Sequence, residues 1–269
     1  MMNCEWRLVP PDCPPMKVVV CVKQIPDPAL PGELDPNTNT LKRDDKLILD
    51  ETDMYGVEMA LQLVEAAGGG EVALVSMAPR DELSGMRSAL AMGADSGSLV
   101  SDDALAGSDA LSTAKVLAGA ISRLEPDLVL AGTESSDGYT GTVPEQVAAL
   151  LDYPSITFAK KIDITDGMVR AQRQTDAGYD DVECSLPALV SVTAGVVEPR
   201  YPSFKGIMGA KSKPVETVTA ADLGIEAGTW AQQVVSVEDA PAREAGEIIE
   251  DDGEAFGKIV EFLDDLKVI

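Results

Sequence analysis

Short, continuous apolar runs alternate with longer segments of helical periodicity along much of the chain. The runs are KVVVCVK at Lys17–Lys23, EVALVSM at Glu71–Met77, DLVLA at Asp127–Ala131 and ALVSVT at Ala188–Thr193. Val-rich runs of this length are typical of strands that are buried on both faces. The segments between them predict helices at Asp50–Ala67, Asp81–Met92 and Asp109–Arg123, with a shorter strand at Ser98–Val100. This order predicts a Rossmann-like α/β fold around a parallel sheet of right-handed βαβ units.

Beyond Gly132 the pattern changes. A polar loop is followed by a predicted helix from about Pro144 to Leu151, with proline in its first turn. The stretch ITDGMVRAQRQT then predicts two strand-like arms around an Asp-Gly turn, and Tyr179–Ser185 predicts a third arm. We expect these antiparallel additions to extend one side of the sheet.

Three regions follow from these patterns. Residues 1–15 contain four prolines and no signal-peptide pattern, so we interpret them as a loose N-terminal extension or an early start codon. Residues 16–215 form the predicted nucleotide-binding α/β domain, which includes the unusual loop 195–215. Residues 216–269 have few apolar positions before the amphipathic end AFGKIVEFLDDLKVI, which predicts an extended C-terminal arm rather than a second core.

Charge and composition exclude several classes of function. The chain has 21 basic and 46 acidic residues, a formal charge of −25, which disfavours binding to nucleic acid or to anionic membranes. It contains no histidine, which excludes Ser-His-Asp and Cys-His catalysis and histidine-ligated zinc. Its four cysteines form no Cys-x-x-Cys pair and no apolar run is long enough to span a membrane. We therefore expect a cytoplasmic protein without a metal site or a catalytic constellation.

A glycine-rich loop carries the first candidate site. GTESSDGYTGTVPEQVAALL follows a buried strand and leads into a helix, the position at which open α/β sheets bind ligands. Gly132, Gly138 and Gly141 would let the backbone approach a phosphate, and the helix start offers free N–H groups. Glu134 and Asp137 could instead bond a ribose or face water. A glycine-rich surface loop without a ligand remains the alternative, because neither a dinucleotide fingerprint nor a P-loop is present.

Two further features lie near that loop in the predicted sheet. The acidic run at Asp50–Asp53 follows the loop of the first strand and either contacts the same ligand or only caps its helix. Lys23 comes just after the first strand and either faces the site or solvent.

The second candidate site is the basic segment EPRYPSFKGIMGAKSKP at residues 198–214. It carries four basic residues against one acid, and we expect Pro199, Pro202 and Gly206 to prevent regular structure. Its apolar residues would be exposed among cations, which favours a docking site for another protein; they are Tyr201, Phe204, Ile207 and Met208. The alternative is a loop that folds back onto its own domain.

These segments together resemble a known family. VCVKQIPD at residues 20–27, ALAMGAD at 89–95, RQTDAGYDDVECSLPALVSV at 173–192 and the basic segment are similar to the β subunit of electron transfer flavoproteins. The resemblance extends from Met16 to Ile269 and is strongest to the actinobacterial branch.

The resemblance implies a non-enzymatic subunit of an αβ heterodimer whose C-terminal arm embraces the α subunit. FAD would lie mainly on α, and β would hold AMP, or a second FAD in the electron-bifurcating members. The pair would relay electrons from flavoprotein dehydrogenases, such as acyl-CoA dehydrogenases, to a quinone reductase. An adenylating enzyme would need an SGGxDS-type loop where this chain has KQIPDP, and a universal-stress-type sensor would lack the basic segment and the arm.

The resemblance also assigns positions. The nucleotide pocket would include Cys21, Asp50, Glu51, Thr52, Asp53, Met77, Gly132, Thr133, Glu134, Ser135, Ser136, Asp137, Gly138, Tyr139, Thr140, Gly141, Thr142 and Val143. Residues 25–28 would approach the flavin of α, and partner docking would use Arg200, Tyr201, Phe204, Ile207, Met208 and Lys211. The chain departs from its relatives at Pro144, which has no N–H to offer a phosphate, and at Phe204, where leucine is usual. Lysines are also usual where this chain has Gly209 and Ser212.

Overall fold

The computed structural model describes residues 15–43, 46–228, 230–238, 246, 248–251 and 253–269. The predicted N-terminal extension therefore lies outside the described residues, apart from Pro15, and so do Cys4 and Cys13. The chain divides into two units, of which the first ends at Val235 and the second begins at Ser236.

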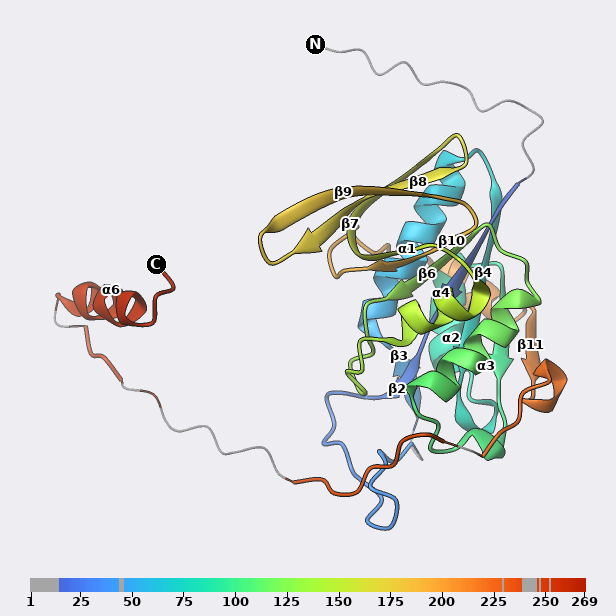
Figure 1. The fold of residues 1–269 in the computed structure, drawn as a ribbon, viewed down its shortest axis with the longest axis horizontal. Helices are drawn as coiled ribbons and strands as arrows, with labels where there is room; N and C mark the ends of the chain where they lie inside the picture. The colour runs from blue at the N-terminus through green and yellow to red at the C-terminus, as the bar shows by residue number, and fades with distance from the viewer. Residues whose placement is uncertain (1–14, 44–45, 229, 239–245, 247, 252) are drawn as a thin grey trace. The chain divides into compact units, whose positions relative to one another are not determined.

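A nine-stranded sheet forms the centre of the first unit, in the order β11-β5-β4-β1-β6-β10-β7-β8-β9 (Figure 1). Neighbouring strands are parallel from β11 to β7, whereas β8 and β9 continue the sheet in antiparallel pairing. The strands are β1 Met16–Cys21, β4 Gly70–Met77, β5 Ser96–Val100, β6 Leu128–Gly132, β7 Ser155–Thr165, β8 Met168–Thr175, β9 Gly178–Ser185, β10 Ala188–Val192 and β11 Val215–Val218. The predicted α/β class and its antiparallel extension are confirmed.

Helices cover both faces of the parallel part. One core cluster joins the sheet to α1 Glu51–Ala66, α2 Ser84–Met92 and α5 Phe204–Ala210, and a second joins it to α3 Ala110–Ser122 and α4 Val143–Leu151. Because both faces are covered, Val18, Val19 and Val20 of β1 are fully buried, as the valine run predicts. A small antiparallel pair, β2 Gln24–Pro26 and β3 Leu47–Leu49, precedes α1.

The basic segment differs from its prediction, because part of it is helical. Ser203 is the N-cap of α5, and its hydroxyl oxygen accepts the N–H of Gly206 at 3.0 Å. Pro202 lies just before the cap, where it blocks no helical hydrogen bond. The expectation of an irregular loop across Phe204–Ala210 is therefore wrong.

The C-terminal region also differs from its prediction. Residues 215–218 form β11, which pairs with β5 at the edge of the sheet, so the domain extends beyond the predicted boundary at residue 215. Leu223 and Ile225 then lie beside Gly119 of α3. The second unit contains α6 Ala255–Asp265, whose apolar side chains are largely exposed; they include Phe256, Ile259, Val260 and Phe262.

Candidate functional site

The carboxyl ends of β1 and β6 mark the point at which the strand order reverses. From β1 the chain passes to β4 and β5 on one side of the sheet, and β6 and β10 then follow on the other side (Figure 1). In open parallel sheets such a switch point leaves a crevice for ligands. Cys21 ends β1 and Gly132 ends β6, so the glycine-rich loop 132–142 begins at this crevice. Met77 ends the neighbouring strand β4 and is half-buried.

Asp50 joins the start of α1 to the glycine-rich loop. One carboxylate oxygen accepts the Thr52 N–H at 3.1 Å and the Thr52 hydroxyl at 2.9 Å, which caps the helix. The other oxygen accepts the Ser136 N–H at 2.8 Å and the Ser136 hydroxyl at 2.9 Å. Asp50 is fully buried and both of its oxygens are engaged. It therefore holds the loop in place instead of facing the crevice.

Asp53 holds the start of the same loop, at the end of β6. Its carboxylate accepts the Lys23 N–H at 2.5 Å and a hydrogen bond from the backbone of Gly132. Burial, reinforced by the charge of Asp50, outweighs these bonds and raises the pKa of Asp53 to about 8. Burial and the adjacent Asp53 also raise the pKa of the Cys21 thiol to about 12, so Cys21 is a neutral wall residue. A Cβ at Gly132 would lie 3.0 Å from Asp53 Oδ1, so this close approach favours glycine.

Asp137 holds the tip of the loop through two cations. Its side chain is only 6% exposed, and its carboxylate accepts bonds from Lys23 Nζ at 2.6 Å and from the Arg43 guanidinium. Lys23 Nζ also donates to Ser135 Oγ at 3.0 Å. Burial acts to raise the pKa of Asp137, but the two cations outweigh it and hold the pKa below its usual value. Asp137 is therefore an internal anion and not a free ligand for ribose.

Sequence reasoning missed Arg43. It lies in the long segment between β2 and β3, and its guanidinium also donates to the Gln24 carbonyl at 3.3 Å. The only signal in the sequence is a group of three cations, Lys42, Arg43 and Lys46, at the end of an acidic and proline-rich loop.

The remaining loop residues leave donors and acceptors for a ligand at the start of α4. Gly141 adopts a φ of +60°, a conformation that favours glycine, and Thr142 makes no side-chain cap of α4. Glu134, Tyr139 and Thr140 are exposed. Within the described part of the chain, Glu145 Oε2 and Gln146 Oε1 are buried without a hydrogen-bond partner. The site thus combines amide donors suited to phosphate with acceptors suited to hydroxyl or amino groups.

The structure thus unites most of the sequence-predicted pocket residues. Cys21, Asp50, Thr52 and Asp53 meet the loop 132–143 at one edge of the sheet. Glu51 is exposed on the first turn of α1.

The basic segment presents apolar side chains, as predicted. Tyr201 and Phe204 are 93% and 81% exposed, and Ile207 and Met208 lie on the same stripe of α5 as Phe204. A cavity of about 490 Å³ opens beside them, between the end of α2 and α5. Arg200 differs from the other predicted docking residues, because its guanidinium contacts Glu58 at 2.7 Å and Glu65 at 2.8 Å on α1.

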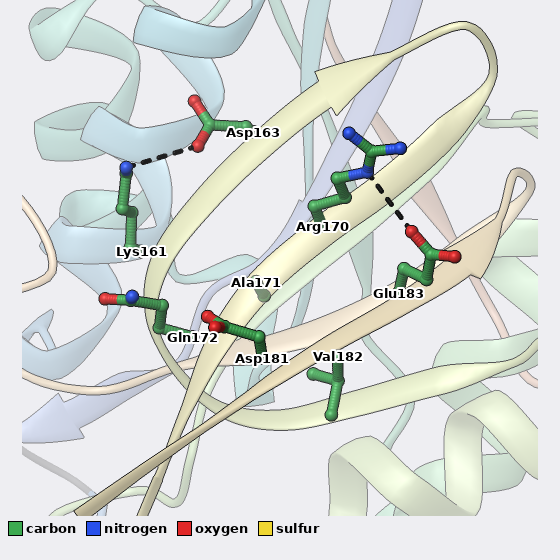
Figure 2. Close-up of a pocket in the computed structure, with 8 residues that line it drawn as sticks. All are labelled: Lys161, Asp163, Arg170, Ala171, Gln172, Asp181, Val182 and Glu183. Carbon is green, nitrogen blue, oxygen red and sulfur yellow. Dashed lines mark hydrogen bonds and ion pairs between the residues drawn. The ribbon is translucent and has the colours of Figure 1, made fainter.

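A second hollow lies on the polar side of the antiparallel extension, outside the predicted site. Figure 2 shows its charged lining, in which Arg170 contacts Glu183 at 3.2 Å and Lys161 lies 3.6 Å from Asp163. Its volume is about 250 Å³. The first pair joins β8 to β9 and the second lies along β7, and exposed ion pairs of this kind are typical of a solvated sheet face.

Comparison with known proteins identifies the family. The family model described as "Electron transfer flavoprotein domain" matches residues 38–223. The chain is 39% identical to the electron transfer flavoprotein subunit beta of Mycobacterium tuberculosis (strain CDC 1551 / Oshkosh) over 263 residues, which cover 94% of this chain and 99% of the relative. The chain belongs to the electron transfer flavoprotein family. The corresponding Mycobacterium leprae (strain TN) subunit is also 39% identical, over 264 residues, with the same coverage. Both matches confirm the resemblance to an actinobacterial β subunit.

More distant members of the family are also similar. The "Caffeyl-CoA reductase-Etf complex subunit CarD" of Acetobacterium woodii is 36% identical over 212 residues, 78% of this chain and 80% of the relative. Among the described residues, no helix is both long and apolar enough to cross a membrane. The same part of the chain brings no three potential metal-ligating side chains together.

Proposed function

We propose that this chain is the β subunit of a heterodimeric electron transfer flavoprotein, a carrier without catalysis of its own. The observation that carries the proposal is similarity along 94% of the chain to β subunits of this family. The αβ pair accepts electrons from flavoprotein dehydrogenases, such as acyl-CoA dehydrogenases, and passes them to an acceptor such as a quinone reductase. FAD belongs mainly to the α subunit, and residues 25–28 of this chain approach it.

The proposed nucleotide of this subunit is AMP, bound in the crevice between β1 and β6. Gly141 and the first amides of α4 hold the phosphate, and Glu134 and Gln146 offer acceptors to the ribose or the base. Asp50, Asp53 and Asp137 keep the loop in shape before the nucleotide arrives, because each already accepts bonds from the protein. A second FAD in the same crevice is the alternative, since one relative is named as part of a caffeyl-CoA reductase complex.

Counting nucleotides tests this assignment. The chain is co-expressed with its α subunit, the purified complex is acid-extracted, and flavin and AMP are quantified per dimer. One FAD and one AMP support a simple carrier, whereas two FADs support the bifurcating alternative. A complex that releases no nucleotide beyond the FAD of α would contradict a ligand in this crevice.

A substitution locates the crevice. Gly141→Val introduces a branched residue at a φ of +60°, and its Cβ would lie 3.3 Å from Glu134 Oε2. We expect less AMP in the complex together with lower stability. Gly167→Val is the matched control, because Gly167 also adopts a positive φ, of +73°, but lies in the turn between β7 and β8, outside the crevice. Unchanged AMP content in Gly141→Val would show that the pocket lies elsewhere.

Two surfaces serve the proposed partners. The exposed apolar face of α6, in the segment predicted to form an arm, is proposed to pack on the α subunit, and co-expression should give a 1:1 complex. A flavin-loaded β monomer would contradict this role.

The exposed side chain of Phe204 is proposed to anchor the dehydrogenase, so Phe204→Ala should slow electron uptake and leave bound FAD unchanged. Loss of flavin or of the αβ dimer in that variant would show that Phe204 is a structural residue.

A further inference from the structure

Lys213 is tied to the end of α2 instead of facing solvent. Its ammonium donates to three backbone carbonyls at the C-terminus of that helix, those of Leu90 at 2.9 Å, Gly93 at 3.1 Å and Ala94 at 2.6 Å. A lysine ammonium has three N–H donors, so this contact uses all of them. The positive charge also faces the negative end of the helix dipole.

Arg87 makes the reciprocal contact. It lies within α2 and its Nη1 donates to the carbonyls of Ala210 at 2.7 Å and Lys213 at 2.8 Å, at and just beyond the end of α5. Lys213, from the segment after α5, therefore binds the carbonyls at the end of α2, and Arg87 of α2 binds the last carbonyl of α5. Between these contacts the backbones approach so closely that a Cβ at Gly206 would lie 2.4 Å from the Ala91 carbonyl oxygen.

Arg200 fastens the chain that leads into α5. Its guanidinium binds both oxygens of Glu58, at 2.7 and 3.1 Å, and its backbone N–H donates to the same carboxylate at 3.2 Å. Glu58 is almost fully buried on α1 and also accepts a bond from Gln62 at 2.7 Å. A bidentate pair with one buried partner fixes orientation as well as position.

Lys205 and Lys211 behave differently. Both are exposed, and neither has an ion pair within the described part of the chain. They flank the exposed side chains of Phe204 and Met208 on a chain whose formal charge is −25. Their charges are available to an approaching acidic surface, whereas the ammonium of Lys213 is engaged by three backbone carbonyls and Arg200 is paired with Glu58 and Glu65.

We propose that the basic segment contains two functional classes of cation. Lys213, Arg87 and Arg200 are positioning residues that hold α5 as a preformed docking helix, and Lys205 and Lys211 attract the partner. The partner that binds this helix is a flavoprotein dehydrogenase with an apolar pocket rimmed by acidic residues. Its pocket would accept the exposed apolar side chains, and its acidic rim would attract the exposed lysines. The inference rests on the proposed docking function and adds which residues preorganise the helix.

A matched pair of variants tests the division. Lys213→Met and Lys211→Met each remove one lysine, two positions apart, from the αβ complex. Hydrogen exchange of the backbone amides in α5 is measured by mass spectrometry without any dehydrogenase. We expect exchange to accelerate about tenfold or more in Lys213→Met, because the segment that follows α5 then loses its anchor on the end of α2 and α5 opens more easily, and to stay unchanged in Lys211→Met.

Stopped-flow reduction by an acyl-CoA dehydrogenase of the same organism, across a range of salt concentrations, supplies the second measurement. Lys211→Met should lower the association rate and weaken its dependence on salt. Lys213→Met should change the salt dependence less than Lys211→Met does and should accelerate dissociation, since a less ordered helix loses preorganisation.

The outcomes separate the two proposals. Equal exchange of α5 in both variants, or an equal change of salt dependence, would overturn the division of the cations. If Lys213→Met gives no folded complex, Arg87→Met is measured in its place against the same control. If Phe204→Ala does not affect electron uptake, the proposed docking function is wrong. The exchange of α5 still tests whether Lys213 orders this helix, because it is measured without a dehydrogenase.

Discussion

The contact between α5 and α2 leaves no space for a side chain at Gly206. Its Cβ would lie 2.4 Å from the Ala91 carbonyl oxygen, whereas at least about 3.0 Å is needed, so the helices must separate by roughly 0.6 Å. Overpacking of this kind costs about 1–3 kcal/mol, and the gain in helix propensity returns about 0.5–1 kcal/mol. We therefore expect Gly206→Ala to lower the free energy of unfolding by roughly 1–2 kcal/mol.

Gly209→Ala is the matched control in the same helix. No atom lies within 4 Å of its added Cβ, so the substitution should stabilise the complex by about 0.5–1 kcal/mol. At roughly 2–4 °C per kcal/mol for a domain of this size, the two variants should shift the thermal midpoint in opposite directions. The midpoint is measured on the αβ complex at one fixed concentration. Equal midpoints for both variants would refute the close packing of α5 on α2.

Two further predictions concern titration. The pKa of Asp53 is raised to about 8, so the folded state retains a proton that the unfolded chain loses near pH 4. The free energy of unfolding should therefore fall as the pH rises from about 5 to 8. Denaturation of the wild type and of Asp53→Asn across this range should show that stability depends less on pH in the variant. Asp137 has the opposite sign: its lowered pKa stabilises the fold above about pH 4, and this contribution is lost as the pH falls through its folded pKa. Asp137→Asn should therefore lose stability at pH 7 and show a smaller acid-induced decrease, and an unchanged denaturation midpoint at pH 7 would contradict the role of its ion pairs.

The parallel sheet could be predicted from sequence because its signals are local. The valine run of β1 must be buried on both faces, and an acid at Asp50 marks the start of a helix whose cap it forms. The glycine-rich loop could likewise be located, since it follows a buried strand and precedes a helix. Those features depend on neighbours in the chain, so periodicity and residue type reveal them.

The remaining features depend on contacts between distant segments. Arg43 meets Asp137 across 94 positions of the chain, and no local pattern indicates such a pairing. The sequence predicts that Gly206 interrupts regular structure, whereas in the structure it admits the Ala91 carbonyl at close range. The contacts of Asp50 with Ser136 and of Lys213 with the end of α2 could not be predicted for the same reason, because sequence shows a charge but not its distant hydrogen-bond partners.

The position of β11 has a consequence for synthesis of the chain on the ribosome. β5 is paired with β4 on one side, and its other edge is completed only by Val215–Val218, which are translated long after Ser96–Val100. Until those four residues emerge, the nascent sheet exposes an unpaired parallel edge that includes Leu99 and Val100, both fully buried in the finished fold. Exposed edges of this kind invite pairing with other chains. During the interval between translation of β5 and of β11, this edge of the nascent subunit is therefore open to misassembly.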